Sequence, residues 1–130
     1  MKRAIKHPDV KDDFSLAPYS AAILDGNYLF ISGQVPFDYL QKEWKFGTIE
    51  SETNKVFDNL IKVLEASNCT LNDVVKTTVF LKDLDDFDAF NKVYATYFKG
   101  IKPARSTVQV GLGAGMKVEI EAIAKINKAD

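Results

Sequence analysis

The chain has one cysteine, one histidine and almost no net charge, and each shortage removes a class of function. Cys69 alone excludes an intrachain disulfide and is expected to be a buried, incidental thiol; with His7 it falls short of the three or four protein ligands of a zinc site. Seventeen basic against eighteen acidic residues, without long runs of one sign, argue against a nucleic-acid partner. A Ser/His/Asp hydrolase would depend on His7, which we expect in a loose terminus.

Long apolar segments are absent too. No apolar run reaches the length of a membrane span, and the first residues form no apolar signal segment. We therefore expect a cytoplasmic protein with no membrane partner. Glycine and proline together number only eleven, which excludes a linker-rich chain.

The apolar content is sufficient for one core. A chain of 130 residues, 46% of them hydrophobic, can bury one core but is too short for two, so we expect a single domain over residues 1–130.

The first half of the chain predicts a hairpin, a loop and a helix. Apolar runs at residues 20–24 and 28–32 flank a turn of Asp, Gly and Asn, which is typical of a β-hairpin. Residues 36–47, which include Trp44, are interpreted as an irregular loop of functional interest. A helical period then predicts a helix over residues 49–66, with Thr48 as its N-cap, acidic residues in its first turn and Asn68 closing it in the left-handed conformation.

The second half predicts a strand, a helix and two strands. Val74–Leu81 is rich in β-branched residues and is expected to be a strand covered on both faces. A helix is expected over residues 85–98, and strands over 105–110 and 117–126. If the N-terminal residues also pair, the order is βββαβαββ. The predicted fold is α+β, a single mixed sheet with two helices packed on one face.

Alternation assigns faces to the last two strands. Arg105, Thr107 and Gln109 point one way from their strand, and Glu119 and Glu121 share one face of theirs. We expect the face bearing Arg105 and Gln109 to have no covering element within the chain. A half-covered sheet of this size commonly finds its second layer in another subunit.

Four positions could carry chemistry. Arg105 opens a strand that Pro103 stiffens, and its guanidinium could bind a carboxylate or phosphate; the alternative is a surface ion pair with Glu119 or Glu121. That carboxylate pair, beside the arginine, could hold a general acid or base, or could simply face solvent. Tyr19, at a strand start, could hydrogen-bond a ligand or pack at the core edge. Gly33, at a strand end, could admit a ligand to the backbone or mark a bulge.

Six short segments, in order and spacing, resemble one family, the RidA (YjgF-type) reactive imine deaminases. They read APYS at 17–20, LFISGQVP at 29–36, DVVKTTVFL at 73–81, FNKVY at 90–94, PARS at 103–106 and VEIEAIA at 118–124. The resemblance implies a fold like that of trimeric chorismate mutase. Three subunits join their sheets into a central barrel, with clefts at the subunit interfaces.

The resemblance also implies an activity and its residues. Members hydrolyse 2-imino acids such as 2-iminopropanoate and 2-iminobutanoate, and their 2-amino-enoic tautomers, to 2-oxo acids and ammonia without a metal or cofactor. By position, Arg105 would bind the substrate carboxylate, Glu119 would handle water and proton transfers, and Tyr19 would line the cleft. Gly33, Thr107 and Asn91 would border the substrate.

The sequence departs from the family pattern at some positions. Thr107 stands where the family often has cysteine, and residues 37–47 and 111–116 differ from the usual loops. Both loops are expected to border the cleft, so substrate preference depends on them. Two other readings stay open: a non-catalytic protein that binds a small carboxylate metabolite, and an RNA-cleaving or translation-inhibiting member of the family.

Overall fold

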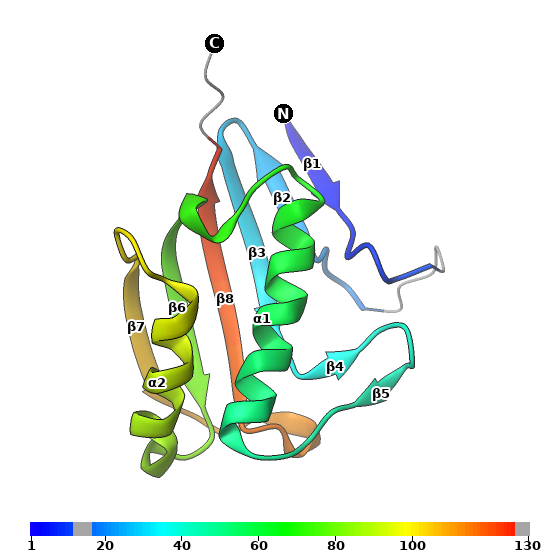
Figure 1. Cartoon of the computed structure of the whole chain (residues 1–130). Helices are drawn as coiled ribbons and strands as arrows, with labels where there is room; N and C mark the ends of the chain where they lie inside the picture. The colour runs from blue at the N-terminus through cyan, green and yellow to red at the C-terminus, as the bar shows by residue number, and fades with distance from the viewer. Residues whose placement is uncertain (12–16, 127–130) are drawn as a thin grey trace.

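The computed structural model describes residues 1–11 and 17–126, and these form a helical layer on one sheet (Figure 1). The elements, in chain order, are β1 (Lys2–Ile5), β2 (Ala22–Asp25), β3 (Tyr28–Gln34), β4 (Phe37–Asp38), β5 (Glu43–Trp44), α1 (Ile49–Glu65), the 3₁₀ turn η1 (Leu71–Asp73), β6 (Val74–Leu81), the 3₁₀ turn η2 (Leu84–Asp86), α2 (Phe87–Tyr97), β7 (Ala104–Gln109), the 3₁₀ turn η3 (Gly113–Gly115) and β8 (Val118–Lys125). The predicted α+β class is confirmed.

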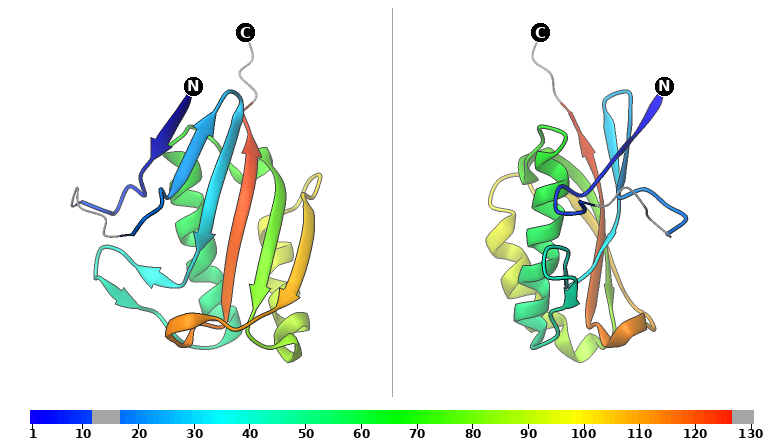
Figure 2. Two further views of the ribbon diagram at one scale, coloured as in Figure 1. Left: turned by 180° about the vertical axis from the view of Figure 1, so that it is seen from behind. Right: turned by 90° about the vertical axis from the view of Figure 1, so that its right-hand side faces the viewer.

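Six strands form one mixed sheet in the order β1-β2-β3-β8-β6-β7. Strands β6 and β7 pair in parallel, and the other neighbours pair antiparallel. Both helices lie on the same side of this sheet, as the view from behind and the edge-on view show (Figure 2). The other side has no helix on it within the described residues.

Helix α1 forms as its sequence predicts. The Thr48 hydroxyl accepts a hydrogen bond from the Ser51 amide at 3.1 Å, which satisfies a donor that the first helical turn leaves unpaired. Val56, Leu60 and neighbouring apolar residues on the same stripe are fully buried against the sheet. Asn68 closes the segment with φ +57°, as expected.

Glu52 connects this helix to β8. Its carboxylate is fully buried and accepts hydrogen bonds from the Gly47 amide at 3.0 Å and the Lys117 amide at 2.7 Å. The Lys117 ammonium lies 3.4 Å away and balances the charge. Because Lys117 directly precedes β8, this contact fixes where β8 begins and therefore where Glu119 lies.

The expected face assignment of β7 is wrong. Arg105 pairs with Thr77 of β6, which is fully buried beneath the helices, so Arg105 faces α2 rather than the open side. The arginine can occupy this covered face because its guanidinium lies over aromatic rings of α2. The open side instead carries Val108, Phe30 and Tyr28, which remain 43%, 46% and 42% exposed. Strand β6 was expected to be covered on both faces, but within the described residues the helices cover only one of them.

Two further expectations also need correction. Residues 36–47 include the two-stranded hairpin β4–β5, whose turn places Lys42 at φ +57°, where glycine would have been the recognisable signal. His7 does not lie in a loose terminus. It is 3% exposed, and its Nε2 atom lies 2.9 Å from Oδ1 of Asn59 on α1.

Candidate functional site

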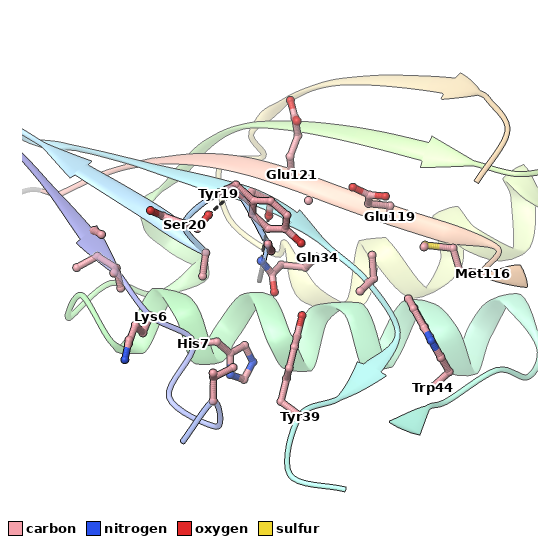
Figure 3. A pocket seen from close by; sticks show the side chains of 18 residues that line it. Lys6, His7, Tyr19, Ser20, Gln34, Tyr39, Trp44, Met116, Glu119 and Glu121 are labelled. Atoms are coloured by element: carbon pink, nitrogen blue, oxygen red, sulfur yellow. Dashed lines mark hydrogen bonds between the residues drawn. The ribbon is translucent and has the colours of Figure 1, made fainter. Parts of the chain in front are cut away.

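A pocket of about 860 Å³ lies at the end of β3, between the N-terminal segment, the β4–β5 hairpin and β8 (Figure 3). It brings together four of the residues that the sequence singled out. Tyr19, Gly33, Glu119 and Glu121 all line it.

Glu119 is the central ionisable group of this pocket. It is partly buried on β8, beside Gly33, where the pairing of β3 with β8 shifts register between Ile31 and Gln34. A side chain at Gly33 would collide with the Glu119 carboxylate, so glycine is what allows this group to lie against the β3 backbone. The bulge expected at Gly33 is therefore present, and the group that lies against its backbone in this chain is the Glu119 carboxylate.

Burial raises the pKa of Glu119, and the neighbouring Glu121 carboxylate adds to the effect. A carboxylate that is less well solvated holds a proton more strongly and is therefore a better general base than an exposed one. Glu121 also lines the pocket but is exposed.

Tyr19 forms the outer wall of the pocket. Its side chain is 67% exposed and lies over the cavity (Figure 3). The segment that carries it is fixed to β3, because the Ser32 hydroxyl donates to the Ser20 carbonyl at 2.7 Å and the Ser32 amide donates to the Ala21 carbonyl at 2.9 Å. These bonds hold the segment that precedes β2 against β3, and the phenol lines the same pocket as Glu119.

Arg105 belongs to a second cluster, between β7 and α2. Its guanidinium carbon lies 4.7 Å from the ring centroid of Tyr94 and 5.7 Å from those of Phe87 and Phe90. The Tyr94 hydroxyl is itself 2.8 Å from the Thr77 hydroxyl, which fixes the ring. Ring contacts hold the guanidinium by its face, so the N–H groups along its edge can meet a carboxylate.

Asn91 and Thr107 lie in the same region. Thr107 follows Arg105 by two residues on the same face of β7, and Asn91 is on α2 next to Phe90. Oδ1 of Asn91 and Oγ1 of Thr107 are both buried, and neither has a hydrogen-bond partner among the described residues. A buried polar atom without a partner is unfavourable, so these two atoms are suited to contact a polar ligand or a neighbouring chain.

One chain does not bring the two clusters together. Arg105 and Glu119 lie on opposite faces of the sheet, on strands separated by β6, which is about 10 Å between strand axes. The expectation of a carboxylate pair beside the arginine is therefore wrong within a single chain. The alternative of an ion pair between Arg105 and Glu119 or Glu121 is wrong for the same reason.

Sequence reasoning did not single out several lining residues. Gln34 and Met116 border the pocket without having been named, whereas Tyr39 and Trp44 belong to the 37–47 segment, for which Trp44 was named. The aromatic residues of the 37–47 segment were a usable signal, because that segment was expected to border the cleft. From the 111–116 segment, Met116 is the residue that lines the pocket.

Three further features were considered: metal sites, membrane-spanning helices and the Cys69 thiol. Across residues 1–11 and 17–126, no group of three or more His, Cys, Asp or Glu could hold a metal ion. No helix in that part of the chain is long and apolar enough to cross a membrane. Cys69 is 1% exposed and burial raises the pKa of its thiol, so it is the buried thiol that was expected.

Comparison with known proteins agrees with this geometry. The family described as Endoribonuclease L-PSP matches residues 11–126. A RutC family protein of Pyrococcus horikoshii is 49% identical over 110 residues, covering 84% of this chain and 87% of that protein. The 2-iminobutanoate/2-iminopropanoate deaminase of Mus musculus is 43% identical over 111 residues, 85% of this chain and 82% of that one. The crystal structure of RidA from an Antarctic Psychrobacter has a TM-score of 0.85 at 39% identity, covering 95% of this chain and all of that one. This chain belongs to the Endoribonuclease L-PSP family, which is the RidA (YjgF-type) family.

Proposed function

We propose that this protein is a 2-iminobutanoate/2-iminopropanoate deaminase, which hydrolyses 2-imino acids and their 2-amino-enoic tautomers to 2-oxo acids and ammonia. The observation that carries the proposal is Glu119, a carboxylate with a raised pKa held against the Gly33 backbone in a pocket. The name of the mouse relative supports the same reaction.

The proposed site needs two chains. Glu119, Tyr19 and Gly33 come from the open face of one subunit, and Arg105, Asn91 and Thr107 come from the β7 edge of its neighbour. Tyr28 and Phe30 on β3 and Val108 on β7 leave large side chains exposed at both sides of the open face, which favours coverage of that face by another subunit. The assembly is a homotrimer, and light scattering should give three times the chain mass of 14.5 kDa.

The chemistry follows from these groups. Arg105 binds the substrate carboxylate through two N–H groups, which fixes the position of the imine carbon. Glu119 accepts a proton from water as the oxygen bonds to that carbon, and the imine nitrogen takes up a proton to give a carbinolamine. Glu119 then takes the proton of the carbinolamine hydroxyl and passes it to the amino nitrogen, the C–N bond breaks as the C=O bond forms, ammonia leaves and the 2-oxo acid remains. An imine carbon is already electrophilic, so acid–base help of about 10²- to 10⁴-fold is sufficient without a metal or cofactor.

A coupled assay tests the proposal. Threonine dehydratase releases 2-iminobutanoate, and semicarbazide traps the imine that remains. Active protein should lower the initial rate of semicarbazone formation and raise the rate of 2-oxobutanoate release. Bound but unprocessed 2-oxobutanoate, with no effect on the imine, would instead indicate a non-catalytic protein that binds small carboxylates.

The description of the matched family favours a second candidate, cleavage of RNA. The net charge of −1 and the two carboxylates that line the pocket weigh against it, because phosphate binding requires basic side chains. Incubation with single-stranded RNA should therefore leave it intact, and the Glu119→Gln variant is the control for any cleavage that is observed.

A further inference from the structure

The far wall of the pocket is aromatic. Tyr39 and Trp44 line the cavity from the β4–β5 hairpin, and Met116 lies beside Trp44 (Figure 3). Phe37 packs edge-on against both, with ring centroids 5.0 Å from Tyr39 and 5.2 Å from Trp44. Phe46 stacks on Trp44 at 5.3 Å with an interplanar angle of 13°. The wall is therefore a connected set of rings.

This wall is held rigidly. Asn59 on α1 donates hydrogen bonds to the carbonyls of Val35 at 2.9 Å and Phe37 at 2.8 Å, at the start of the hairpin. The Lys45 amide donates to the Pro36 carbonyl at 2.8 Å and closes the hairpin's other strand. A surface that is already ordered loses little conformational entropy when it binds a ligand.

The pocket is larger than the smallest substrates of the proposed reaction need. In the single chain it holds about 860 Å³, which exceeds what a four-carbon acid fills, and its aromatic wall belongs to the same chain as Glu119. Glu119, Tyr39 and Trp44 line the same pocket, so a substituent on an imine carbon held at Glu119 has the hairpin wall within the same cavity. Trp44 is still 37% exposed, so an apolar substituent would remove further aromatic surface from water.

We infer that the preferred substrates are 2-imino acids with bulky apolar side chains, aromatic ones first, and that Trp44 and Tyr39 determine this specificity. The inference rests on the proposed deaminase function. Elimination from serine or threonine yields only small imino acids. A bulky imino acid arises when an amino acid loses two electrons and two protons from its C–N bond to an oxidised flavin, which molecular oxygen then reoxidises to give hydrogen peroxide. The reaction class that supplies this substrate is therefore amino-acid oxidation.

The test compares substrates on the same protein. An L-amino-acid oxidase, with catalase present, generates the imines of phenylalanine, leucine and alanine, and semicarbazide traps what the protein leaves. We expect kcat/KM for the phenylalanine imine to exceed that for the alanine imine by about tenfold or more. In Trp44→Ala that ratio should fall by about tenfold. Because both substrates are measured on one preparation, partial unfolding lowers both rates and leaves the ratio unchanged.

Leu40→Ala is the matched control. Leu40 is an apolar residue in the turn of the same hairpin, 60% exposed, and it does not line the pocket. Its substrate ratio should equal that of the wild type. A wild type that prefers the alanine imine, or a ratio that Trp44→Ala leaves unchanged, would overturn the inference while leaving the deaminase function intact. Failure to hydrolyse any imine would overturn the proposed function itself.

Discussion

Replacing Glu119 by glutamine separates its role from that of Glu121. The substitution keeps the shape of the side chain but removes the group that accepts a proton from water. General base help is typically worth about 10²- to 10⁴-fold, so kcat should fall by at least about 100-fold, which corresponds to about 2.7 kcal/mol of lost transition-state stabilisation. KM should change little, because Arg105 and not Glu119 binds the carboxylate.

Glu121→Gln is the internal control. Glu121 lies two residues further along β8, about 6.6 Å away, and is exposed at the pocket's edge, so its rates should stay within about threefold of the wild type. Because the Glu121 charge helps to raise the pKa of Glu119, removing it should move the acidic limb of the pH–rate profile to lower pH. Steady-state hydrolysis of 2-iminobutanoate measures both variants. An inactive Glu121→Gln beside an active Glu119→Gln would refute the assignment of the base.

Glu119→Gln, which should lower activity, should not lower stability. The pKa of Glu119 is raised in the folded state, so the stability it contributes is complete below its ordinary pKa of 4.5 and is lost as pH rises through the folded value. At neutral pH the folded chain therefore holds an unfavourable charge. Glu119→Gln should unfold at a temperature equal to or above that of the wild type at pH 7, which differential scanning calorimetry can measure. A large decrease would show that the carboxylate has a structural role.

Three other predictions concern the remaining groups. Gly33→Ala places a methyl group where the Glu119 carboxylate lies, so we expect kcat to fall by about tenfold or more with circular dichroism unchanged; full activity would contradict the close approach. Tyr94→Phe removes the hydroxyl that fixes the ring beneath Arg105, so KM should rise by about three- to tenfold with kcat nearly constant, and equal losses in both would refute a positioning role. Burial lowers the pKa of His7 below its ordinary 6.5, so the free energy of unfolding should fall as pH decreases below about 6.5, and His7→Gln should flatten that slope in urea titrations.

The elements of the fold were predictable because their signals are local. The buried stripe of α1, the Thr48 cap and the β-branched run of β6 each depend on residues within a few positions of one another. The β4–β5 hairpin was missed because Lys42, rather than glycine, takes the left-handed conformation in its turn. The alternation of side chains correctly placed Glu119 and Glu121 on one face of β8. It did not indicate which face of a strand packs against the helices.

The site was harder to predict because it depends on distant contacts. An arginine usually marks an exposed face, yet the Arg105 guanidinium lies over the aromatic rings of α2. The alternation of residues along β7 carries no information about these rings. His7 is buried by Asn59, 52 residues away. Of the residues that the resemblance named, Tyr19, Gly33 and Glu119 line the pocket, whereas Arg105 lies on the opposite face of the same chain.

Complementation between two inactive variants tests the two-chain site most directly. Arg105→Ala and Glu119→Gln subunits should each be inactive alone, and the two are co-expressed at equal levels so that the whole pool of pure and mixed trimers is assayed together. An interface regains both groups when the intact Glu119 of one subunit meets the intact Arg105 of the next, which random mixing produces at about one quarter of interfaces. The account predicts that the mixture recovers about a quarter of wild-type kcat per site. A mixture as inactive as its parents would show that one chain must supply both residues, and would contradict the site described here.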